Sequence, residues 1–482
     1  MDKSNQFITV TALLYLFALK ILFLIYGQPL PDETYYWLWA KKIDFSFYDH
    51  PPLSSWLQSL FSQFISNKQL LLRIIPTLSS IAIIVVIFVW VKALKLHNDL
   101  KEHLTHLLLF FSIPVLNIFL TISFPDPLMI LMLSLSGLFF FLYLEYKNQN
   151  KIIQYIYWYL SVCFFGLALI SKYNAVLFGL GLFLFLALSK KEKNNLLYTK
   201  HFFFSILLIL LIFSPIAFWN TTNDYASFGF HLDERLNFEL SIADTLKNLI
   251  IFVVSILISF SPILIFNLVK LYQTDRFNEK ISLDLKPAKH ILLVCCLFFF
   301  FLLFCVQPLY YWIIPAIVML LPYLPKIIQS KSHRILHCMF GIILITLLCF
   351  NNMIYPLSIH FPKVDRESAI IYGWENISGV IEEEKKINGI EKILFTDYRL
   401  GSLYAFHSQN DAIDVLMEKR ETQFDMWRKK EKVVNSLILV DDDFPLNNKV
   451  SSLFTDIVFL RKIDVKVMQK TIISYQLYRG VK

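Results

Sequence analysis

Charged residues are scarce in this sequence of 482 residues: Asp, Glu, Lys and Arg make up 17%, whereas soluble globular proteins contain about a quarter. Hydrophobic residues reach 56% and include 46 phenylalanines. A water-soluble fold would have nowhere to bury so many apolar side chains. The composition therefore excludes a wholly soluble protein and predicts an integral membrane protein.

Several common site patterns are also missing. The six cysteines all fall in apolar stretches, without the spacing of a disulfide framework or a zinc site. The sequence has no glycine-rich phosphate loop, no nucleotide-binding unit and no evident internal repeat. We therefore expect no resident metal or cofactor, with a divalent cation left open.

Long apolar runs dominate the first 355 residues. Runs of about 20 apolar residues indicate membrane-spanning helices. Eleven are expected, at 8–26, 70–94, 104–121, 128–146, 152–170, 175–188, 202–219, 246–269, 291–306, 309–323 and 335–354. The first run lacks a cleavage site and is long, so it is expected to remain as a helix rather than be removed as a signal peptide.

The net charge of +8 is distributed in a way that predicts the orientation of these helices. Lysines and arginines collect in alternate short loops, near 92–101, 147–151, 190–200, 276–289 and 326–334. Such loops face the cytoplasm, so the charge reports topology rather than a nucleic-acid partner. With eleven spans, the N-terminus is expected in the cytoplasm and the C-terminal region in the periplasm.

The C-terminal region has a different character. Apolar runs at 393–395 and 436–440 and an alternating segment at 471–478 indicate strands, and a helix-like segment follows Tyr398. We expect two domains: a mainly α, polytopic transmembrane helical bundle at 1–355 and a small α/β periplasmic domain at 356–482.

The first loop on the opposite, external side holds an unusual group of polar and aromatic residues. Asp32 and Glu33 precede an aromatic stretch that includes Tyr35, Tyr36 and Trp37, and the segment Tyr48-Asp49-His50-Pro51-Pro52 follows. Aromatic rings of this kind prefer the membrane interface. Two carboxylates that begin an interfacial helix there could meet a lipid-borne substrate and external water together.

Each charged candidate also has a structural explanation. Adjacent acids can reflect the preference of a helix N-terminus for negative charge. Arg73 and Lys172 lie near span ends, where cations extend to the interface, and His50 and Asp126 beside prolines can hold turns. The run Asp441-Asp442-Asp443 is similar to the metal-binding acids of nucleotide-sugar transferases, but three acids after a strand most often form a solvated turn, which is the expectation here.

The ordered set of motifs resembles one family along almost the whole chain. The elements are 32–37, 48–52, 73–76, 124–127, 171–173, 214–220, 226–235 and Gln-Phe-Asp-Met-Trp at 423–427. Together they resemble the bacterial relatives of the protein O-mannosyltransferases and aminoarabinose lipid A transferases. These are membrane glycosyltransferases of the GT-C type, which use polyprenyl-phosphate sugars.

The resemblance implies transfer of a hexosyl or pentosyl group from a lipid phosphate to an envelope acceptor, with inversion at the anomeric carbon. By position it implies Asp32 as catalytic carboxylate with Glu33 as its neighbour and Asp126 on the opposite wall; His50, Arg73, Lys172 and Arg235 for the donor phosphate; and Tyr35, Tyr36, Tyr48, Asp49 and Tyr173 for substrate. A hydroxyl acceptor needs Asp32 as a base. A lipid A phosphate would need it only to orient substrate or to stabilise charge.

Two other classes remain as alternatives. A transporter or flippase for lipid-linked sugars would place ionisable groups near the membrane midplane and show repeated halves. A non-catalytic assembly protein would have no need of the acidic first loop. The placement of the acids at span ends favours the transferase, with the bacterial inner membrane as its location.

Overall fold

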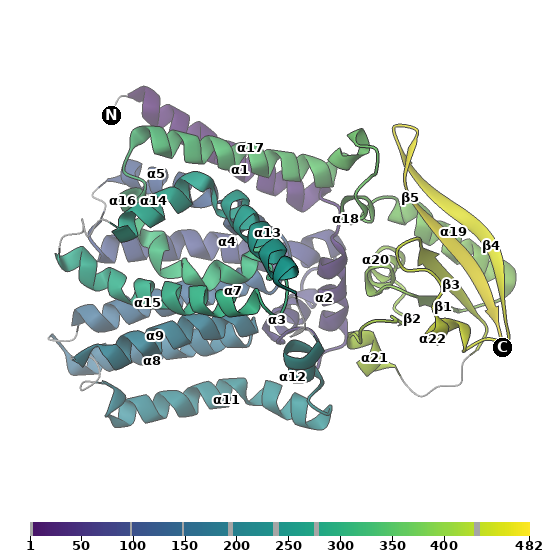
Figure 1. Ribbon diagram of the computed structural model, residues 1–482, viewed down its shortest axis with the longest axis horizontal. Coiled ribbons are helices and arrows are strands. Elements are labelled where there is room, and N and C mark those ends of the chain that lie inside the picture. The colour runs from purple at the N-terminus through teal and green to yellow at the C-terminus, as the bar shows by residue number, and fades with distance from the viewer. Residues whose placement is uncertain are drawn as a thin grey trace. The chain divides into compact units, whose positions relative to one another are not determined.

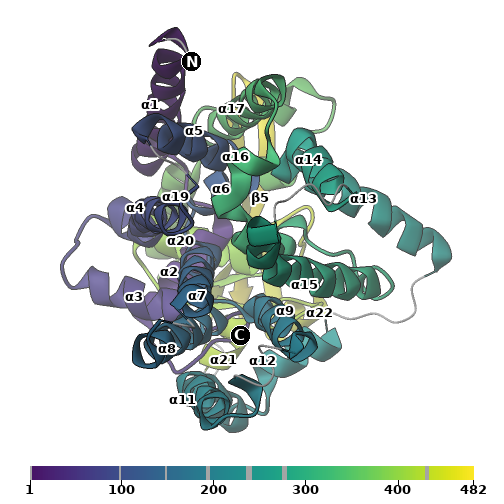
Figure 2. The same ribbon diagram turned by 90° about the vertical axis from the view of Figure 1, so that its left-hand side faces the viewer.

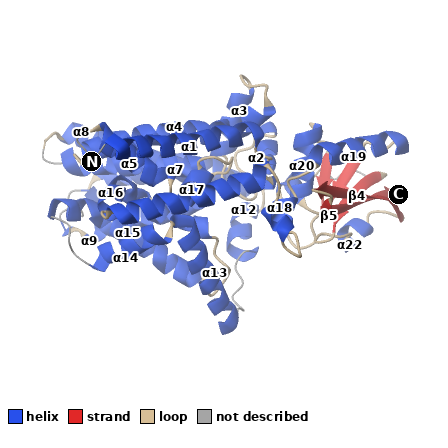
Figure 3. Cartoon of the chain, turned by 90° about the horizontal axis from the view of Figure 1, so that it is seen from above, coloured by secondary structure: helices blue, strands red, loops and turns tan. Residues whose placement is uncertain are grey.

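The computed structural model describes residues 3–96, 99–146, 149–190, 196–234, 241–273, 279–428 and 434–482. The chain forms two compact units. The helical unit comprises residues 1–21, 50–54 and 73–346, and the mixed unit comprises 22–49, 55–72 and 347–482. Among the described residues, strands occur only in the mixed unit (Figure 3). The boundary at 355 stays a prediction, because the mixed unit also includes two N-terminal segments.

Eight described helices are long and apolar enough to cross a membrane. They are α1 (Lys3–Tyr26), α4 (Lys68–Ala93), α7 (Asp126–Glu145), α8 (Lys151–Leu169), α11 (Lys200–Thr222), α13 (Ile242–Phe260), α15 (Glu279–Leu302) and α17 (Lys331–Met353). A bent pair at 310–327 gives a ninth if it forms one span. A polytopic helical membrane protein is thus confirmed, whereas the count of eleven spans is not.

Prolines break three of the apolar segments that are predicted as single helices. The segment 104–121 divides into α5 (Leu100–Phe111) and α6 (Pro114–Phe119), and 246–269 divides into α13 and α14 (Pro262–Gln273). The segment 309–323 forms the 3-10 helices η5 (Tyr310–Ala316) and η6 (Val318–Tyr323), and a bend of 66° separates η5 from the helices that follow it. One continuous helix in each segment is therefore wrong, because proline lacks an N–H and its ring disfavours a helical residue before it.

The helices of the helical unit lie side by side. Helix α8 packs against α7 and α11, and α15 packs against α9 (Val176–Leu188). Figure 1 shows these helices running in the same direction across the view, and Figure 2 shows α8 and α11 nearly end-on. Helix α7 is 72% buried over its most apolar window, whereas α11 and α13 are 17% and 11% buried. A helix that is apolar all round and still exposed is expected to face lipid.

Helix α4 contains Pro76 and bends at Arg73, whose backbone φ of −116° departs from helical values. Since Pro76 has no N–H, the carbonyl of Leu72 loses its partner within the helix. The side-chain amide of Gln58, from α3 (Leu53–Ser62), donates to the Leu72 carbonyl at 3.4 Å and to that of Leu71 at 3.2 Å. A neighbouring polar side chain thus satisfies the backbone groups that the proline leaves open.

A five-stranded sheet of order β2-β1-β3-β5-β4 forms the centre of the mixed unit. The strands are β1 (Lys392–Phe395), β2 (Ile413–Val415), β3 (Ser436–Asp441), β4 (Asp456–Val467) and β5 (Lys470–Val481). β1 is parallel to β2 and β3, while β5 is antiparallel to β3, with Leu394 opposite Ile438 and Ile438 opposite Tyr478. Every residue of β3 is buried, which explains its continuous apolar sequence.

The strands predicted at 393–395, 436–440 and 471–478 are confirmed as β1, β3 and β5. The helix-like segment after Tyr398 is α20 (Tyr398–Ser408), which packs against α19 (Trp374–Asn388). The first-loop helix is also confirmed as α2 (Pro31–Lys41), and it packs against α20 within the mixed unit. This packing brings the predicted acidic loop to the C-terminal sheet.

Candidate active site

Helix α2 places the two adjacent acids in different surroundings. Pro31 begins the helix, and the carboxylate of Glu33 accepts a hydrogen bond from the N–H of Leu30 at 3.0 Å. Glu33 thereby caps the helix N-terminus, as negative groups favourably do. Asp32, one residue earlier, points in another direction because neighbouring helix residues do not face each other.

Asp32 lies partly buried and accepts a hydrogen bond at Oδ1 from the hydroxyl of Tyr398, at 2.8 Å. Desolvation by burial raises the pKa of Asp32, and the nearby Asp49 carboxylate raises it further. The Tyr398 hydroxyl, Arg399 and Arg420 act in the opposite direction, without cancelling the effect of burial. A carboxyl group with a raised pKa suits proton transfer at neutral pH better than an ordinary aspartate.

Asp49 belongs to a hydrogen-bonded network next to Asp32. The hydroxyl of Tyr35 donates to Asp49 Oδ2 at 2.7 Å and accepts from the N–H of Gln423 at 2.6 Å. Arg420 forms an ion pair with the other oxygen of Asp49, and its guanidinium lies 5.0 Å from the Tyr398 ring centroid. Burial disfavours the charge of Arg420, but Asp49 raises its pKa overall. A fixed cation therefore stands beside both acids.

Aromatic packing fixes the remaining predicted residues of the first loop. The rings of Tyr36 and Trp39 meet edge to face at 4.9 Å, and the Tyr35 ring stacks on Phe424 at 5.6 Å. The backbone N–H of Tyr48 donates to the side chain of Gln423 at 2.7 Å. Tyr35, Tyr36 and Tyr48 are all buried. Their role in substrate binding stays a prediction.

The structure adds three residues that sequence reasoning does not assign to the site: Tyr398, Arg420 and Gln423. The segment 423–427 carries part of the family resemblance, yet its sequence gives no sign that it contacts the first loop. Tyr398 lies 366 positions from Asp32, and Gln423 lies 388 from Tyr35. No local pattern signals contacts over such separations.

The helical unit holds a second polar cluster. The ammonium group of Lys172 donates to both carboxylate oxygens of Asp126, at 2.7 and 2.6 Å, and both side chains are buried. Lys172 also lies 4.5 Å from the centroid of the Tyr311 ring. Asp126 is the first residue of α7, where a negative charge is favourable. The two residues therefore form a buried ion pair, rather than a turn acid and a cation extending to solvent.

A cavity of about 470 Å³ in the helical unit adjoins this pair. Its polar lining includes His50, Lys172 and His231, and its apolar lining includes Phe298, Phe301 and Leu302. The rings of His50 and His231 lie 6.3 Å apart, and His231 meets Tyr173 edge to face at 5.2 Å. This combination of cationic or titratable groups with an apolar wall fits an amphiphilic ligand.

Arg73, a predicted phosphate ligand, is not among the residues that line this cavity. Arg73 is completely buried at the bend of α4, and its backbone carbonyl accepts from the hydroxyl of Thr77 at 2.8 Å. Arg235 lies outside the described residues. Their role in phosphate binding stays a prediction.

The three acids at the end of β3, Asp441, Asp442 and Asp443, lie in different surroundings. Asp441 is buried at 2% exposure and pairs with Arg366 at 2.5 Å, so the prediction of a solvated turn is wrong for this residue, while Asp442 and Asp443 are exposed. Within the described ranges, no three His, Cys, Asp or Glu residues are grouped as a metal site.

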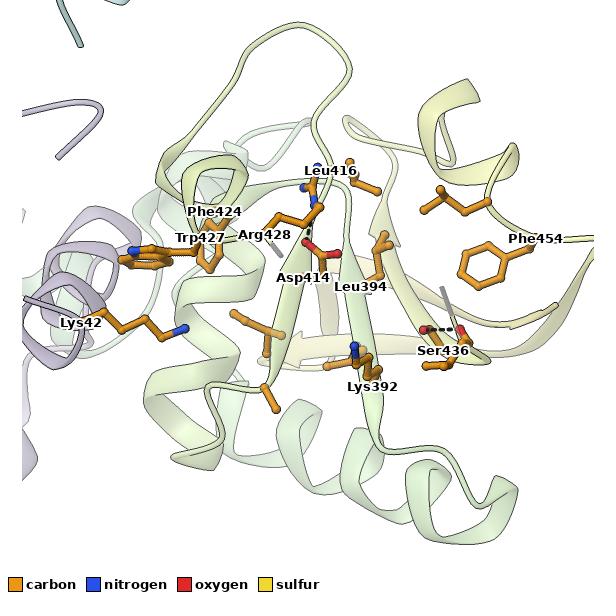
Figure 4. A pocket seen from close by; sticks show the side chains of 15 residues that line it. Lys42, Lys392, Leu394, Asp414, Leu416, Phe424, Trp427, Arg428, Ser436 and Phe454 are labelled. Carbon is orange, nitrogen blue, oxygen red and sulfur yellow. Dashed lines mark hydrogen bonds and ion pairs between the residues drawn. The ribbon is translucent and has the colours of Figure 1, made fainter. Parts of the chain in front are cut away.

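The mixed unit contains a separate cavity of about 390 Å³, whose lining includes residues of β1, β2 and β3 (Figure 4). Lys42, Lys392 and Arg428 contribute charge, and Trp427 and Phe424 contribute aromatic surface. Lys42 lies 4.8 Å from the Trp427 ring centroid, and Arg428 pairs with Asp414 at 3.0 Å. Asp32 and its hydrogen-bonded network do not line this cavity.

Comparisons with known proteins agree with these features. The model of the dolichyl-phosphate-mannose-protein mannosyltransferase family matches residues 49–219. ArnT from Cupriavidus metallidurans in the apo state is 10% identical with a TM-score of 0.67, covering 100% of this chain and 99% of that one. The same protein bound to undecaprenyl phosphate is 11% identical with a TM-score of 0.62, covering 98% of each chain.

A third match is the Archaeoglobus fulgidus oligosaccharyltransferase in the apo form, which is 13% identical with a TM-score of 0.50. It covers 86% of this chain and 65% of the other. No curated protein matches the sequence. The chain thus has the ArnT-like fold, and residues 49–219 match the dolichyl-phosphate-mannose-protein mannosyltransferase family; both findings agree with the resemblance seen in the sequence.

Proposed function

We propose that this protein transfers a sugar from a polyprenyl-phosphate donor to a lipid, glycan or protein acceptor of the cell envelope. The observation that carries the proposal is the cavity of the helical unit, where His50, Lys172 and His231 stand beside an apolar wall. A polyprenyl phosphate combines an anionic head with a long apolar chain and so matches this lining. The ArnT-like fold supports it, since one ArnT structure holds undecaprenyl phosphate.

The first step in this proposal is binding of the donor phosphate by cations. Lys172 is held by both oxygens of Asp126, so its ammonium group is fixed before substrate arrives. Preorganised positive charge stabilises the negative charge that develops on a departing phosphate. His50, Arg73 and Arg235 are proposed to contribute to the same task, with protonation increasing the effect of His50.

The second step is attack by the acceptor on the anomeric carbon. With a hydroxyl acceptor, Asp32 takes the proton as the new C–O bond forms and the bond to the phosphate oxygen breaks, leaving the electron pair on the phosphate. A single displacement inverts the anomeric centre. General base catalysis of this kind contributes roughly 10² to 10⁴ in rate. With a phosphate acceptor, Asp32 would instead orient substrate or stabilise the positive charge of the sugar.

The test is mass spectrometry of envelope lipids and glycans from cells with the gene intact, deleted or carrying Asp32→Asn. Deletion and Asp32→Asn should both remove a sugar from an envelope component, while a polyprenyl-phosphate sugar accumulates. Asp44→Asn is the matched control, because Asp44 lies in the same region and its carboxylate contacts the backbone N–H of the exposed Phe45.

Other outcomes assign the other classes. If the lipid-linked sugar is unchanged and Asp32→Asn behaves as wild type, the transferase proposal fails and an assembly role replaces it. If the lipid-linked sugar crosses the membrane without being consumed, the protein is a flippase.

A further inference from the structure

Tyr398 lies at a position of the α/β sheet that often carries functional groups. β1 ends at Phe395, Asp397 caps α20, and Tyr398 is the first residue of that helix. The carboxyl ends of parallel strands form the edge at which open α/β sheets bind ligands. In this protein the tyrosine at that edge contacts Asp32 of the first loop.

The segment around Tyr398 is held by a charged network. Asp397 accepts from Arg366 at 2.7 Å and from Arg399 at 2.9 Å, and Arg366 also pairs with Asp441 at 2.5 Å. The guanidinium groups of Arg366 and Arg399 lie 5.0 and 5.1 Å from the ring centroid of Phe444. Paired and stacked groups of this kind limit the movement of the residue between them. These contacts therefore hold the hydroxyl of Tyr398 in position.

The distance between the Tyr398 hydroxyl and the Asp32 carboxylate is that expected between a general base and the hydroxyl whose proton it takes. The two oxygens are 2.8 Å apart, and a general base must lie about 2.6 to 3.2 Å from the atom whose proton it takes. Burial and the neighbouring Asp32 raise the pKa of Tyr398 well above that of an ordinary tyrosine, so Tyr398 keeps its proton and acts as the donor.

We propose that Tyr398 is a positioning residue for Asp32: in the free enzyme its hydroxyl orients the carboxylate and occupies the place that the acceptor hydroxyl takes. The inference rests on the proposed function. When the acceptor binds, its hydroxyl replaces Tyr398 at Oδ1. The acceptor proton passes to Asp32 during transfer, and Tyr398 retains its own.

Charged and titratable groups from several elements face Asp32. They are Tyr398 and Arg399 of α20, Asp49 after α2, and Arg420 before α21 (Gln423–Trp427). A hydrogen bond from Tyr398 favours the ionised carboxylate, as do the two arginines, whereas Asp49 opposes it. Loss of the Tyr398 hydroxyl should therefore allow Asp32 to bind a proton at a higher pH.

The experiment compares wild type, Tyr398→Phe and Tyr404→Phe as purified full-length proteins. Tyr404 is the matched control, since it is a buried tyrosine of the same helix whose hydroxyl donates to another carboxylate, that of Glu382. Infrared difference spectroscopy against pH follows the carboxylic C=O band that Asp32→Asn removes. Tyr398→Phe should move the midpoint of this band to higher pH, whereas Tyr404→Phe should leave it in place.

Activity gives a second readout, with membranes of the deletion strain supplying donor and acceptor. At pH values below the Asp32 midpoint, Tyr398→Phe should lower the rate of transfer about tenfold or more. The ionised Asp32 carboxylate loses a hydrogen bond, so less of it remains ionised to act as the base. At high pH, Tyr398→Phe should reach half-maximal rate with a smaller amount of acceptor-containing membrane, because the acceptor no longer has to displace the Tyr398 hydroxyl from Asp32. Site-specific 3-fluorotyrosine at 398 keeps the side-chain shape with a more acidic hydroxyl and should move the infrared midpoint to lower pH.

The outcomes separate the inference from the proposed function. An unchanged midpoint in Tyr398→Phe and in the fluorinated protein overturns the role of Tyr398, even if Asp32→Asn is inactive. Transfer by Asp32→Asn at the wild-type rate overturns the catalytic role of Asp32 whatever the infrared spectra show.

Discussion

Asp32 and Asp126 show at the residue scale how two buried or partly buried carboxylates can have different uses. Asp126 is neutralised by Lys172, whereas Asp32 contacts the uncharged Tyr398 hydroxyl. Because the pKa of Asp32 is raised in the folded protein, its protonated form stabilises the fold below the unfolded pKa. This stabilisation is lost as the pH rises through the folded pKa. Replacement of Asp32 by neutral Asn should therefore leave the protein folded at neutral pH.

Substitution within the ion pair of Lys172 and Asp126 is expected, by contrast, to destabilise the protein. Lys172→Met leaves the completely buried Asp126 without its cation. Breaking a buried pair on one side typically costs about 3–5 kcal/mol. The free energy of unfolding in detergent should fall by that order, and Asp126→Asn in the same chain should restore most of it. Equal stability of Lys172→Met and wild type would show that the pair does not hold this region together.

The residues of the candidate site were predicted to very different extents. The acids at 32–33 and 49 stand out in the sequence because polar residues are conspicuous beside apolar spans. The capping role of Glu33 and the contact of Asp32 with Tyr398 do not. Sequence proximity gives the position of a carboxylate along the chain, but the direction of its side chain depends on which partner packs against it.

At the element scale, close packing between α9 and α15 sets a strict limit on side-chain size. A Cβ added to Gly181 would lie 2.3 Å from the Cα of Ile291. Backbone atoms cannot move aside as a flexible side chain can, so the helices would have to separate. Overpacking of this kind typically costs about 1–3 kcal/mol.

Gly181→Ala should accordingly lower the melting temperature of the detergent-solubilised protein. Gly379→Ala in α19 is the control, because no atom lies within 4 Å of the added Cβ. An alanine there should stabilise the helix by about 0.5–1 kcal/mol. If both variants lowered stability equally, the close approach of α9 and α15 would not explain the effect of Gly181.

At the scale of the whole molecule, the bent pair at 310–327 decides whether the two ends of the chain lie on the same side of the membrane. Eight long spans would return the chain to its starting side, and nine would not. The lysine-rich loops predict the orientation independently of this count. We propose that Lys326, at the end of the bent pair, faces the cytoplasm and that the strand-containing C-terminal region faces the periplasm.

Labelling with a membrane-impermeant maleimide tests this orientation. In a background without the six native cysteines, Glu391→Cys should react in cells whose outer membrane is permeabilised. Lys326→Cys should react only after lysis; both side chains are exposed in the structure. The reverse pattern would place the C-terminal region in the cytoplasm.

The sequence by itself determined the features that depend on local hydrophobicity. A run of about 20 apolar residues favours the membrane, and short apolar runs such as 393–395 and 436–440 favour strands that are buried on both faces. The tertiary structure alone decided that Tyr398, Arg420 and Gln423 lie against the first loop. Contacts between residues more than 360 positions apart arise when the chain folds back on itself, and the local pattern around each residue carries no record of its partner.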